Sequence, residues 1–189
     1  MTTSPFKSTL RTLVLIDGFH LNSLTKKHNM NMEFLVFRDL LNQAPLLGVP
    51  KYYTTVQITS DGEPTNNIAS LLSWLSFNGY NVTQQNVYQI NTSDTKEVKY
   101  TTSPILMDMC IDAISLYYEQ TYQRLLIVSG NREIVPFIKH LRDLGVQIDV
   151  ISSIDLDAVS QEVRSNCDYF YEFTDLAPLF FRSKETSTT

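Results

Sequence analysis

The sequence predicts an α/β fold, a three-layer α/β/α sandwich with a mainly parallel central sheet. Short apolar runs rich in β-branched residues alternate along the chain with stretches whose apolar residues recur at helical spacing. Apolar runs without polar alternation are typical of strands that are buried on both faces. Alternating strands and helices then place helices on both sides of the sheet.

Length and charge predict one acidic domain. The chain has 189 residues, 43% of them hydrophobic, and we expect a single domain over residues 12–181 between a flexible N-terminus, 1–11, and a disordered tail, 182–189. The 15 basic and 20 acidic residues give a formal net charge of −5. This balance excludes a strongly basic nucleic-acid coat, so any affinity for phosphate must come from a local patch.

Cysteine usage and hydropathy predict a cytoplasmic protein. Cys110 and Cys167 form no CxxC pair and are expected to be small buried hydrophobes in a reducing compartment. The polar N-terminus has no signal-peptide core, and no apolar run approaches the ~20 residues of a membrane span. We therefore expect a soluble protein without a membrane partner.

The elements of the first half each have a local signal. The apolar run TLVLI stops at the turn Asp17-Gly18, and Asn78-Gly79 closes an amphipathic helical pattern. A turn cluster at residues 60–64 follows the strand expected at 52–58. The expected elements are strands at 12–16, 52–58 and 82–90 and helices at 32–41 and 68–77.

The second half begins with a polar stretch, residues 91–103, which predicts a long surface loop. Pro104 can then open a helix, and Gly145 ends another. The expected elements are helices at 104–122, 135–144 and 157–165 and strands at 125–128, 147–151 and 169–173.

In an open parallel sheet, ligands bind outside the carboxyl ends of the strands. This rule selects residues 17–22, after the first strand, and residues 129–133, after the strand at 125–128. Asp17 either projects its carboxylate into a crevice there or caps the segment that follows, and its position alone favours neither reading.

Further acids could join this site. Asp108 and Asp112 are four residues apart on one face of the expected helix 104–122, where like charges repel and a divalent cation would relieve the repulsion. Alternatively, one faces solvent and the other forms a cap or a salt bridge. Asn131 and Glu133 are oxygen donors just past a strand end, although Asn131 could equally be an ordinary helix cap. Oxygen ligands suit Mg²⁺ or Mn²⁺ rather than zinc.

Two segments carry a resemblance to a known family. LVLIDGFHLN, and much later LLIVSGNREIVPFIKHLRDLGVQIDVIS, resemble the NYN family, the LabA-like or DUF88 branch of the PIN-like nucleases, over about residues 12–179. The second segment is the more specific, because Ser129-Gly130, Val135-Pro136 and residues 141–145 match in register. The resemblance implies a PIN-like fold and cleavage of RNA phosphodiesters by metal-activated water.

The resemblance also implies residue roles. Asp17 matches the first metal-binding carboxylate of the family, and Asp112 matches a later helix aspartate. Asn131 and Glu133 stand where the family has two aspartates, while Leu106 stands at another aspartate and Ser103 at a lysine. The implied ligands of Mg²⁺ or Mn²⁺ are Asp17, Asp112, Glu133 and Asn131. The implied catalytic acids are Asp17, Asp112 and Glu133, with Asp108 off register beside them.

Contacts to single-stranded RNA require local positive charge and polar groups. The expected substrate-binding residues are His20, Asn22, Ser129, Asn131, Arg132, Lys96 and Lys99. Lys26 and Lys27 could add charge and Phe19 could stack on a base, although scattered lysines can also be an ordinary solvated face.

The leading hypothesis is a metal-dependent ribonuclease. The alternative is a catalytically weakened member that acts as an RNA-binding or protein-interaction module, and a homodimer is a family expectation. A phosphoacceptor receiver domain would need adjacent acids after the first strand, and a haloacid-dehalogenase-like phosphatase would need Asp-x-Asp. Asp17-Gly18-Phe19 supplies neither pattern.

Overall fold

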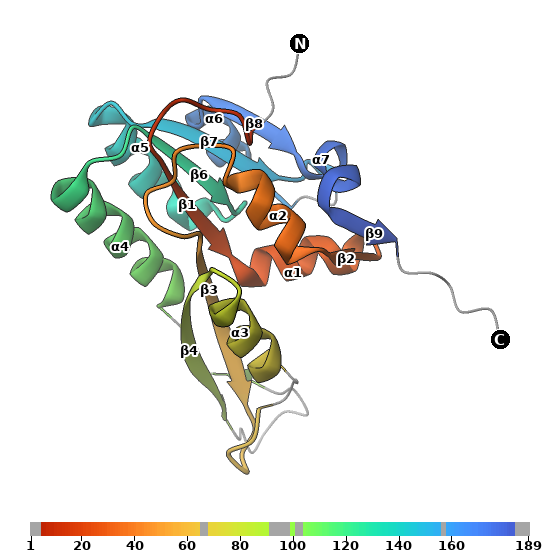
Figure 1. Cartoon of the computed structure of the whole chain (residues 1–189). Helices are drawn as coiled ribbons and strands as arrows, with labels where there is room; N and C mark the ends of the chain where they lie inside the picture. The colour runs from red at the N-terminus through yellow and green to blue at the C-terminus, as the bar shows by residue number, and fades with distance from the viewer. Residues whose placement is uncertain (1–4, 65–67, 91–98, 101–103, 156–157, 184–189) are drawn as a thin grey trace.

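A parallel sheet organises the molecule (Figure 1). The computed structural model describes residues 5–64, 68–90, 99–100, 104–155 and 158–183, and the described strands form a sheet in the order β5-β4-β3-β1-β6-β7-β8. All neighbouring pairs are parallel except β4 with β5. The strands are β1 (Thr12–Asp17), β3 (Lys51–Ile58), β4 (Asn81–Ile90), β5 (Lys99–Tyr100), β6 (Arg124–Val128), β7 (Gln147–Ser152) and β8 (Tyr169–Glu172).

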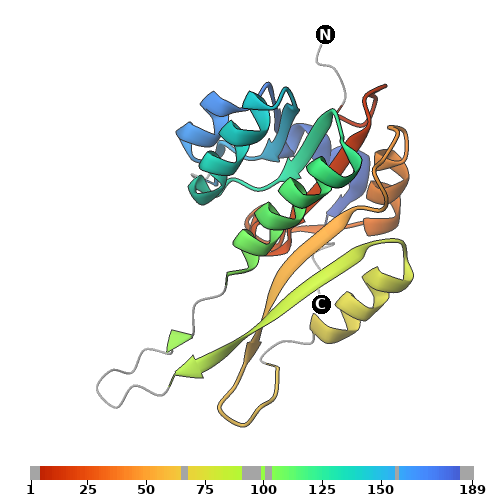
Figure 2. The same cartoon turned by 90° about the vertical axis from the view of Figure 1, so that its left-hand side faces the viewer.

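Helices cover both faces of the sheet, which confirms the predicted three-layer architecture. One face packs against α1 (Gly18–Lys27), α2 (Phe34–Leu41), α3 (Ile68–Phe77) and α7 (Phe173–Phe180). The other face packs against α4 (Ile105–Gln120), α5 (Val135–Asp143) and α6 (Gln161–Asn166). In Figure 2, α4, drawn in green, lies on the viewer's side of the sheet.

The central strand β1 shows why residues 13–16 are all apolar. Val14 and Ile16 belong to the core under α1, α2 and α3, whereas Leu13 and Leu15 belong to the core under α4 and α5. All six residues of β1 are buried because both faces of the strand are covered. Alternation within β1 therefore decides which helical layer each side chain contacts, and Asp17 continues the row of Leu13 and Leu15.

Two helices were not expected from the sequence. α1 follows Asp17 directly, and in it only Gly18, Leu21 and Leu24 are buried, so its apolar pattern is weak. α7 begins at Phe173, expected as the end of a strand, and contains Pro178, a residue that usually breaks helices. Both helices depend on tertiary packing more than on local periodicity.

A second, smaller sheet was also not expected. It consists of β2 (Met30–Met32) and β9 (Phe181–Ser183), paired antiparallel. β9 begins at the last residue of the expected domain and continues into the expected tail, 182–189, of which residues 184–189 lie outside the described residues. A pairing between segments so far apart in the sequence leaves no local signal.

Residues 5–11, expected as part of a flexible N-terminus, pack against the body of the molecule. The side chain of Phe6 is 1% exposed and meets Phe37 and Phe180 edge to face, with ring centroids 5.9 and 5.8 Å away. The apolar surface of Phe6 holds the segment in place. Residues 1–4 lie outside the described part of the chain.

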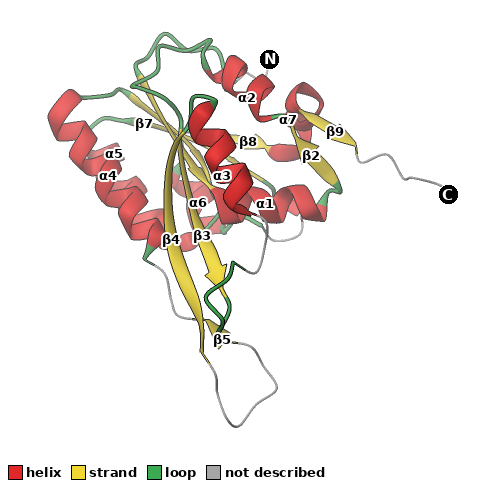
Figure 3. Cartoon of the chain, turned by 60° about the horizontal axis from the view of Figure 1, so that its bottom comes forward, coloured by secondary structure: helices red, strands yellow, loops and turns green. Residues whose placement is uncertain are grey.

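The β3–β4 pair extends past the rest of the sheet, with β5 near its end (Figure 3). The expected surface loop, 91–103, lies largely outside the described residues, and so does Lys96, while Lys99 lies in β5. Among the described helices, none combines the length and the apolar character that crossing a membrane requires.

Candidate functional site

The site lies where the direction of the chain connections reverses. From β1 the chain adds β3 and β4 on one side, and later adds β6, β7 and β8 on the other. β1 and β6 are therefore neighbours whose following connections diverge, which is where open parallel sheets bind ligands, and we call the meeting point of their carboxyl ends the crevice. Asp17 ends β1, and Ser129 directly follows β6. Both predicted segments, 17–22 and 129–133, meet at this crevice.

Asp17 bridges the two strands. Its Oδ2 accepts a hydrogen bond from Ser129 Oγ at 3.1 Å, and its Oδ1 accepts one from the backbone N–H of His20 at 3.0 Å, which caps α1. The crevice role and the capping role therefore coexist. Burial raises the pKa of Asp17 above its ordinary value, although the hydrogen bonds from His20 and Ser129 oppose this shift.

His20 joins a third strand to the crevice. Its Nε2 lies 2.9 Å from Ser152 Oγ at the end of β7. Burial, with a smaller repulsion from Lys27, lowers the pKa of His20 to about 4. The imidazole is therefore neutral at pH 7 and can act as both donor and acceptor through its two ring nitrogens.

Gly130 allows these elements to approach each other. A Cβ at this position would lie 2.1 Å from the backbone oxygen of Ala158, 2.8 Å from Ser152 Oγ and 2.9 Å from His20 Cε1. Any larger residue would have to displace backbone. The glycine thus lets the β6 end pack directly against β7 and α1.

Asp112 and Asp108 lie on α4 with partners of their own. Asp112 Oδ2 accepts a hydrogen bond from Tyr53 Oη at 2.7 Å and lies 3.4 Å from Lys51 Nζ. Asp108 accepts a hydrogen bond from the side-chain amide of Gln85. Burial, followed by the hydrogen bond to Asp112, raises the pKa of Tyr53, so the phenol stays protonated and donates. Asp112 therefore forms a salt bridge, as one of the two alternatives for this pair of aspartates predicted.

The residues after Ser129-Gly130 form a short 3₁₀ helix, η1 (Arg132–Ile134). Asn131 Oδ1 accepts a hydrogen bond from the backbone N–H of Glu133 at 2.9 Å, so Asn131 serves as the ordinary cap considered above. The side chains of Arg132 and Glu133 are exposed.

The acids expected as metal ligands are not gathered into one group. Among the described residues, no group of three or more His, Cys, Asp or Glu side chains is placed to hold a metal. Both oxygens of Asp17 already accept hydrogen bonds, and Lys51 supplies the positive charge beside Asp112. Asp17 and Asp112 thus have separate partners, whereas Asp17, Ser129 and His20 form one connected group.

A cleft of about 500 Å³ opens beside the carboxyl end of β1, and we call it the carboxyl-edge cleft. Its lining combines apolar side chains of α1, β2 and α3 with hydroxyl and amide groups and one lysine. It is lined by Gly18, Phe19, Leu21, Asn22, Thr25, Lys26, Met30, Asn31, Met32, Phe34, Tyr52, Thr54, Thr55, Gln57, Ile68 and Leu71. Of the residues expected to contact RNA, it contains Phe19, Asn22 and Lys26.

Several lining residues were not predicted, for different reasons. Asn31 belongs to β2, which was not predicted, and Thr54 and Gln57 were assigned only to a strand. The alternation Met30-Asn31-Met32 is the one local hint of a short strand with a polar face. The position of Tyr52 also follows from packing, because a Cβ at Gly18 would lie 2.6 Å from its ring.

A comparison with family models decides the family. The model of the NYN domain matches residues 11–176. The chain belongs to the NYN family. NYN is a PIN-like nuclease family, so the resemblance carried by the two sequence segments is confirmed. No curated protein matches the chain.

A solved structure shares the fold of this NYN domain. The protein of unknown function VPA0982 from Vibrio parahaemolyticus RIMD 2210633 superposes with a TM-score of 0.62 and 13% sequence identity, covering 96% of this chain and 100% of that chain. This similarity concerns the fold alone. It supports the arrangement of helices about the parallel sheet over nearly the whole length.

Proposed function

We propose that this NYN domain binds single-stranded RNA at the carboxyl-edge cleft and the adjoining crevice, with cleavage weakened or lost. The observation that carries the proposal is the cleft itself, which gathers an aromatic ring, an amide and a cation next to the end of β1. Phe19 is 69% exposed there, so its ring is available for a base, and Lys26 can contact a phosphate.

The shape of the site supports a single strand over a duplex. A cleft of about 500 Å³ has room for an unstacked nucleotide. In duplex RNA the bases are stacked and paired, so they are unavailable to such a cleft. Asn22, Asn31 and Thr54 would supply hydrogen-bonding groups to the base edges, and the half-buried Asn131 would contact the backbone beside it, whereas Ser129, expected to contact RNA, is fully buried.

Weakened cleavage is proposed because the acids are engaged separately. Asp17 is hydrogen bonded within the crevice, Asp112 is paired with Lys51, and Glu133 is exposed. Family members with more carboxylates would concentrate more negative charge at this edge. We therefore propose that this chain acts in the cell by holding RNA or by presenting it to a protein partner.

A second candidate function is the metal-dependent ribonuclease. It is favoured by the family match over residues 11–176 and by the position of Asp17 at the β1–β6 crevice. In that case Asp17, Asp112, Glu133 and Asn131 would be the ligands of Mg²⁺ or Mn²⁺, with Asp108 as a further acid, and His20 and Arg132 would contact the scissile phosphate.

Binding of a fluorescently labelled RNA tests the leading proposal. Fluorescence anisotropy should show tighter binding of a single strand than of the same sequence in a duplex. Phe19→Ala should weaken binding by about 1–3 kcal/mol if its ring stacks on a base. Lys139→Ala, which removes an exposed lysine from α5, is the matched control and should bind as wild type. Absence of saturable binding, or equal binding of the duplex, would overturn the proposal.

A cleavage assay on the same strand separates the two candidates. The chain is incubated with Mg²⁺, with Mn²⁺ and with EDTA, and Asp17→Asn is compared with wild type. Binding without metal-dependent cleavage supports the leading proposal. Cleavage that requires the metal and is lost in Asp17→Asn supports the second one.

Compartment and assembly are part of the proposal. The two free cysteines, Cys110 and Cys167, are compatible with a reducing compartment, and we propose cytoplasmic RNA as the ligand. We also keep the homodimer as a proposal, and light scattering of the purified protein would measure its mass in solution.

A further inference from the structure

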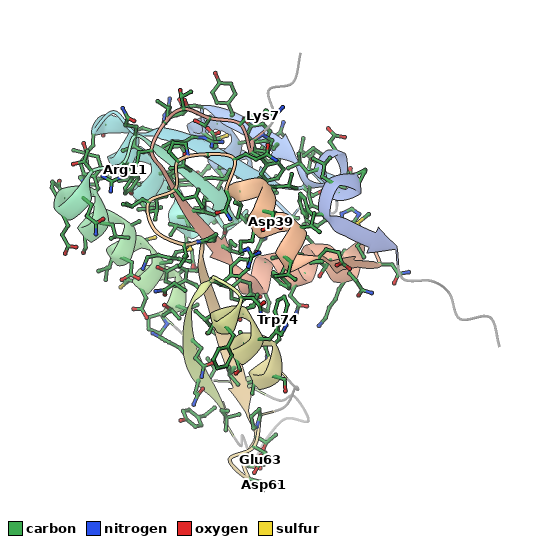
Figure 4. All side chains as sticks on the ribbon, viewed as in Figure 1. Lys7, Arg11, Asp39, Asp61, Glu63 and Trp74 are labelled. Atoms are coloured by element: carbon green, nitrogen blue, oxygen red, sulfur yellow. The ribbon has the colours of Figure 1, made fainter. Side chains whose placement is uncertain are left out.

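A second cleft of about 500 Å³ lies at the opposite edge of the sheet, and we call it the amino-edge cleft. It is formed where β6, β7 and β8 begin, with residues 7–9 and Gln43 beside them. Its lining includes Lys7, Ser8, Thr9, Arg124, Asp149 and Tyr169. Figure 4 shows Lys7 at the end of the molecule opposite Asp61 and Glu63. Arg124 begins β6 and Ser129 follows its end, so the whole strand separates this cleft from the crevice at Asp17.

Arg124, one of the residues that line this cleft, has unused hydrogen-bonding capacity. Its Nε and Nη2 donate to Asp149 Oδ2, at 2.8 and 2.5 Å, and Nη2 also donates to the carbonyl oxygen of Pro5 at 2.7 Å. Its Nη1 is buried and has no hydrogen-bond partner among the described residues. Guanidinium groups carry two N–H donors on this nitrogen, and leaving them unpaired in the interior is costly.

The charge of Asp149 is already compensated. Its Oδ2 accepts from Arg124 and lies 3.4 Å from Tyr171 Oη, and its Oδ1 accepts from Gln147 Nε2 at 2.8 Å. The ion pair is therefore internally neutral, and Lys7 adds a further positive charge to the lining. An incoming anion would meet unpaired donors and a lysine rather than a free carboxylate.

An aromatic surface lies beside these donors. Tyr169 is 48% exposed, and its ring stacks on that of Tyr171 with centroids 6.4 Å apart and planes at 21°. The Tyr171 ring thus supports one face of Tyr169. A planar heterocycle can lie on exposed tyrosine, while the hydroxyl groups of Ser8 and Thr9 can bond a sugar or a phosphate.

We propose that the amino-edge cleft binds a nucleoside monophosphate. In this assignment the phosphate contacts Arg124 Nη1 and Lys7, and the base lies against Tyr169. The lining offers cationic donors for an anionic group and an exposed tyrosine for a planar ring. A ligand that carries both groups and fits a cleft of this size is a nucleoside monophosphate. This site is independent of the proposed RNA-binding function, because none of its residues lines the carboxyl-edge cleft.

Isothermal titration calorimetry with the full chain tests the proposal, using adenosine 5′-monophosphate, adenosine and inorganic phosphate as separate ligands. We expect saturable binding of the monophosphate and weaker binding of the other two. Lys7→Ala and Tyr169→Ala should each weaken it roughly tenfold, as expected for loss of one charged donor or one stacking ring. Lys139→Ala and Phe19→Ala should leave it unchanged.

The double variant Arg124→Gln/Asp149→Asn replaces the ion pair with a neutral pair and should abolish binding. Cooperative unfolding shows whether the double variant is folded. If it is not folded, Lys7→Ala and Tyr169→Ala still test the proposal. No saturable binding at millimolar monophosphate would overturn the proposal. So would equal affinity for inorganic phosphate, or binding that depends on Phe19 instead of Tyr169.

Discussion

The imidazole of His20 is held neutral by its surroundings, and this has a measurable thermodynamic consequence. Its pKa lies near 4 in the folded chain against an ordinary 6.5, so between these pH values the unfolded chain binds a proton that the folded chain does not. The free energy of unfolding therefore falls as the pH is lowered through this range. Asp17, whose pKa is raised, contributes with the opposite sign above pH 3.8.

We predict that His20→Gln flattens the loss of stability between pH 6.5 and pH 4. The contribution removed is at most about 3 kcal/mol. Urea unfolding at pH 7 and at pH 4.5 measures the change in the free energy of unfolding for each chain. Asp17 is present in both chains, so its contribution cancels in the comparison. His140→Gln, at an exposed histidine on α5, is the control and should keep the wild-type slope. An unchanged slope in His20→Gln would refute the prediction.

Gly130→Ala should destabilise the fold at the crevice. The added methyl would overlap the backbone oxygen of Ala158, and relieving the overlap requires the β6 end to move. We expect a loss of about 2–3 kcal/mol in the free energy of unfolding, measured by urea denaturation. Gly48→Ala is the comparison variant, because its methyl would meet open space and the only strain would come from the left-handed φ of 71°. We expect it to lower the free energy of unfolding by about 1–2 kcal/mol. A Gly130→Ala cost no larger than that of Gly48→Ala would contradict this account.

The residues of the site were predictable to different degrees. Asp17 could be placed because an apolar run followed by Asp-Gly marks a strand end. Its bond to Ser129 could be anticipated only from the rule for parallel sheets. The pairing of Asp112 with Lys51 and Tyr53 could not be anticipated, because it joins residues about sixty positions apart across a helix and a strand.

At the scale of elements, the contrast between β6 and α1 explains which helices and strands could be predicted from the sequence. All residues of β6 are buried, and after Arg124, which pairs with Asp149, the strand consists of apolar residues only. α1 buries little, and its start is set by a cap that only the folded crevice completes. Trp74 on α3 is 40% exposed, because α3 packs mainly through Leu72 and Leu75 (Figure 4).

The N-terminal segment should behave as a structural element. Phe6→Ala removes a buried ring from the contact between α2 and α7, and we expect a loss of about 3–5 kcal/mol. Thermal or urea unfolding followed by circular dichroism measures this loss. Phe77→Ala is the matched control, because Phe77 is 87% exposed at the end of α3 and should cost almost nothing. Similar stabilities of the two variants would mean that the segment does not contribute to the fold.

At the scale of the whole molecule, the net charge of −5 limits how RNA can be held. Binding must rest on few phosphate contacts and on contacts to bases. We therefore predict a shallow dependence of RNA affinity on salt, with Lys26→Ala reducing the slope of log K against log salt by about 0.7. Anisotropy titrations from low to physiological salt measure the slope. A steep slope that Lys26→Ala does not change would place the RNA on another surface.

The small β2–β9 sheet links the far end of the described chain to the carboxyl-edge cleft. Met30, Asn31 and Met32 line that cleft, and their strand is held by residues 181–183. At the other end, Lys7, Ser8 and Thr9 line the amino-edge cleft. Fusion partners or purification tags attached next to either segment would thus act as perturbations of a ligand site, so assays of this protein call for untagged chain.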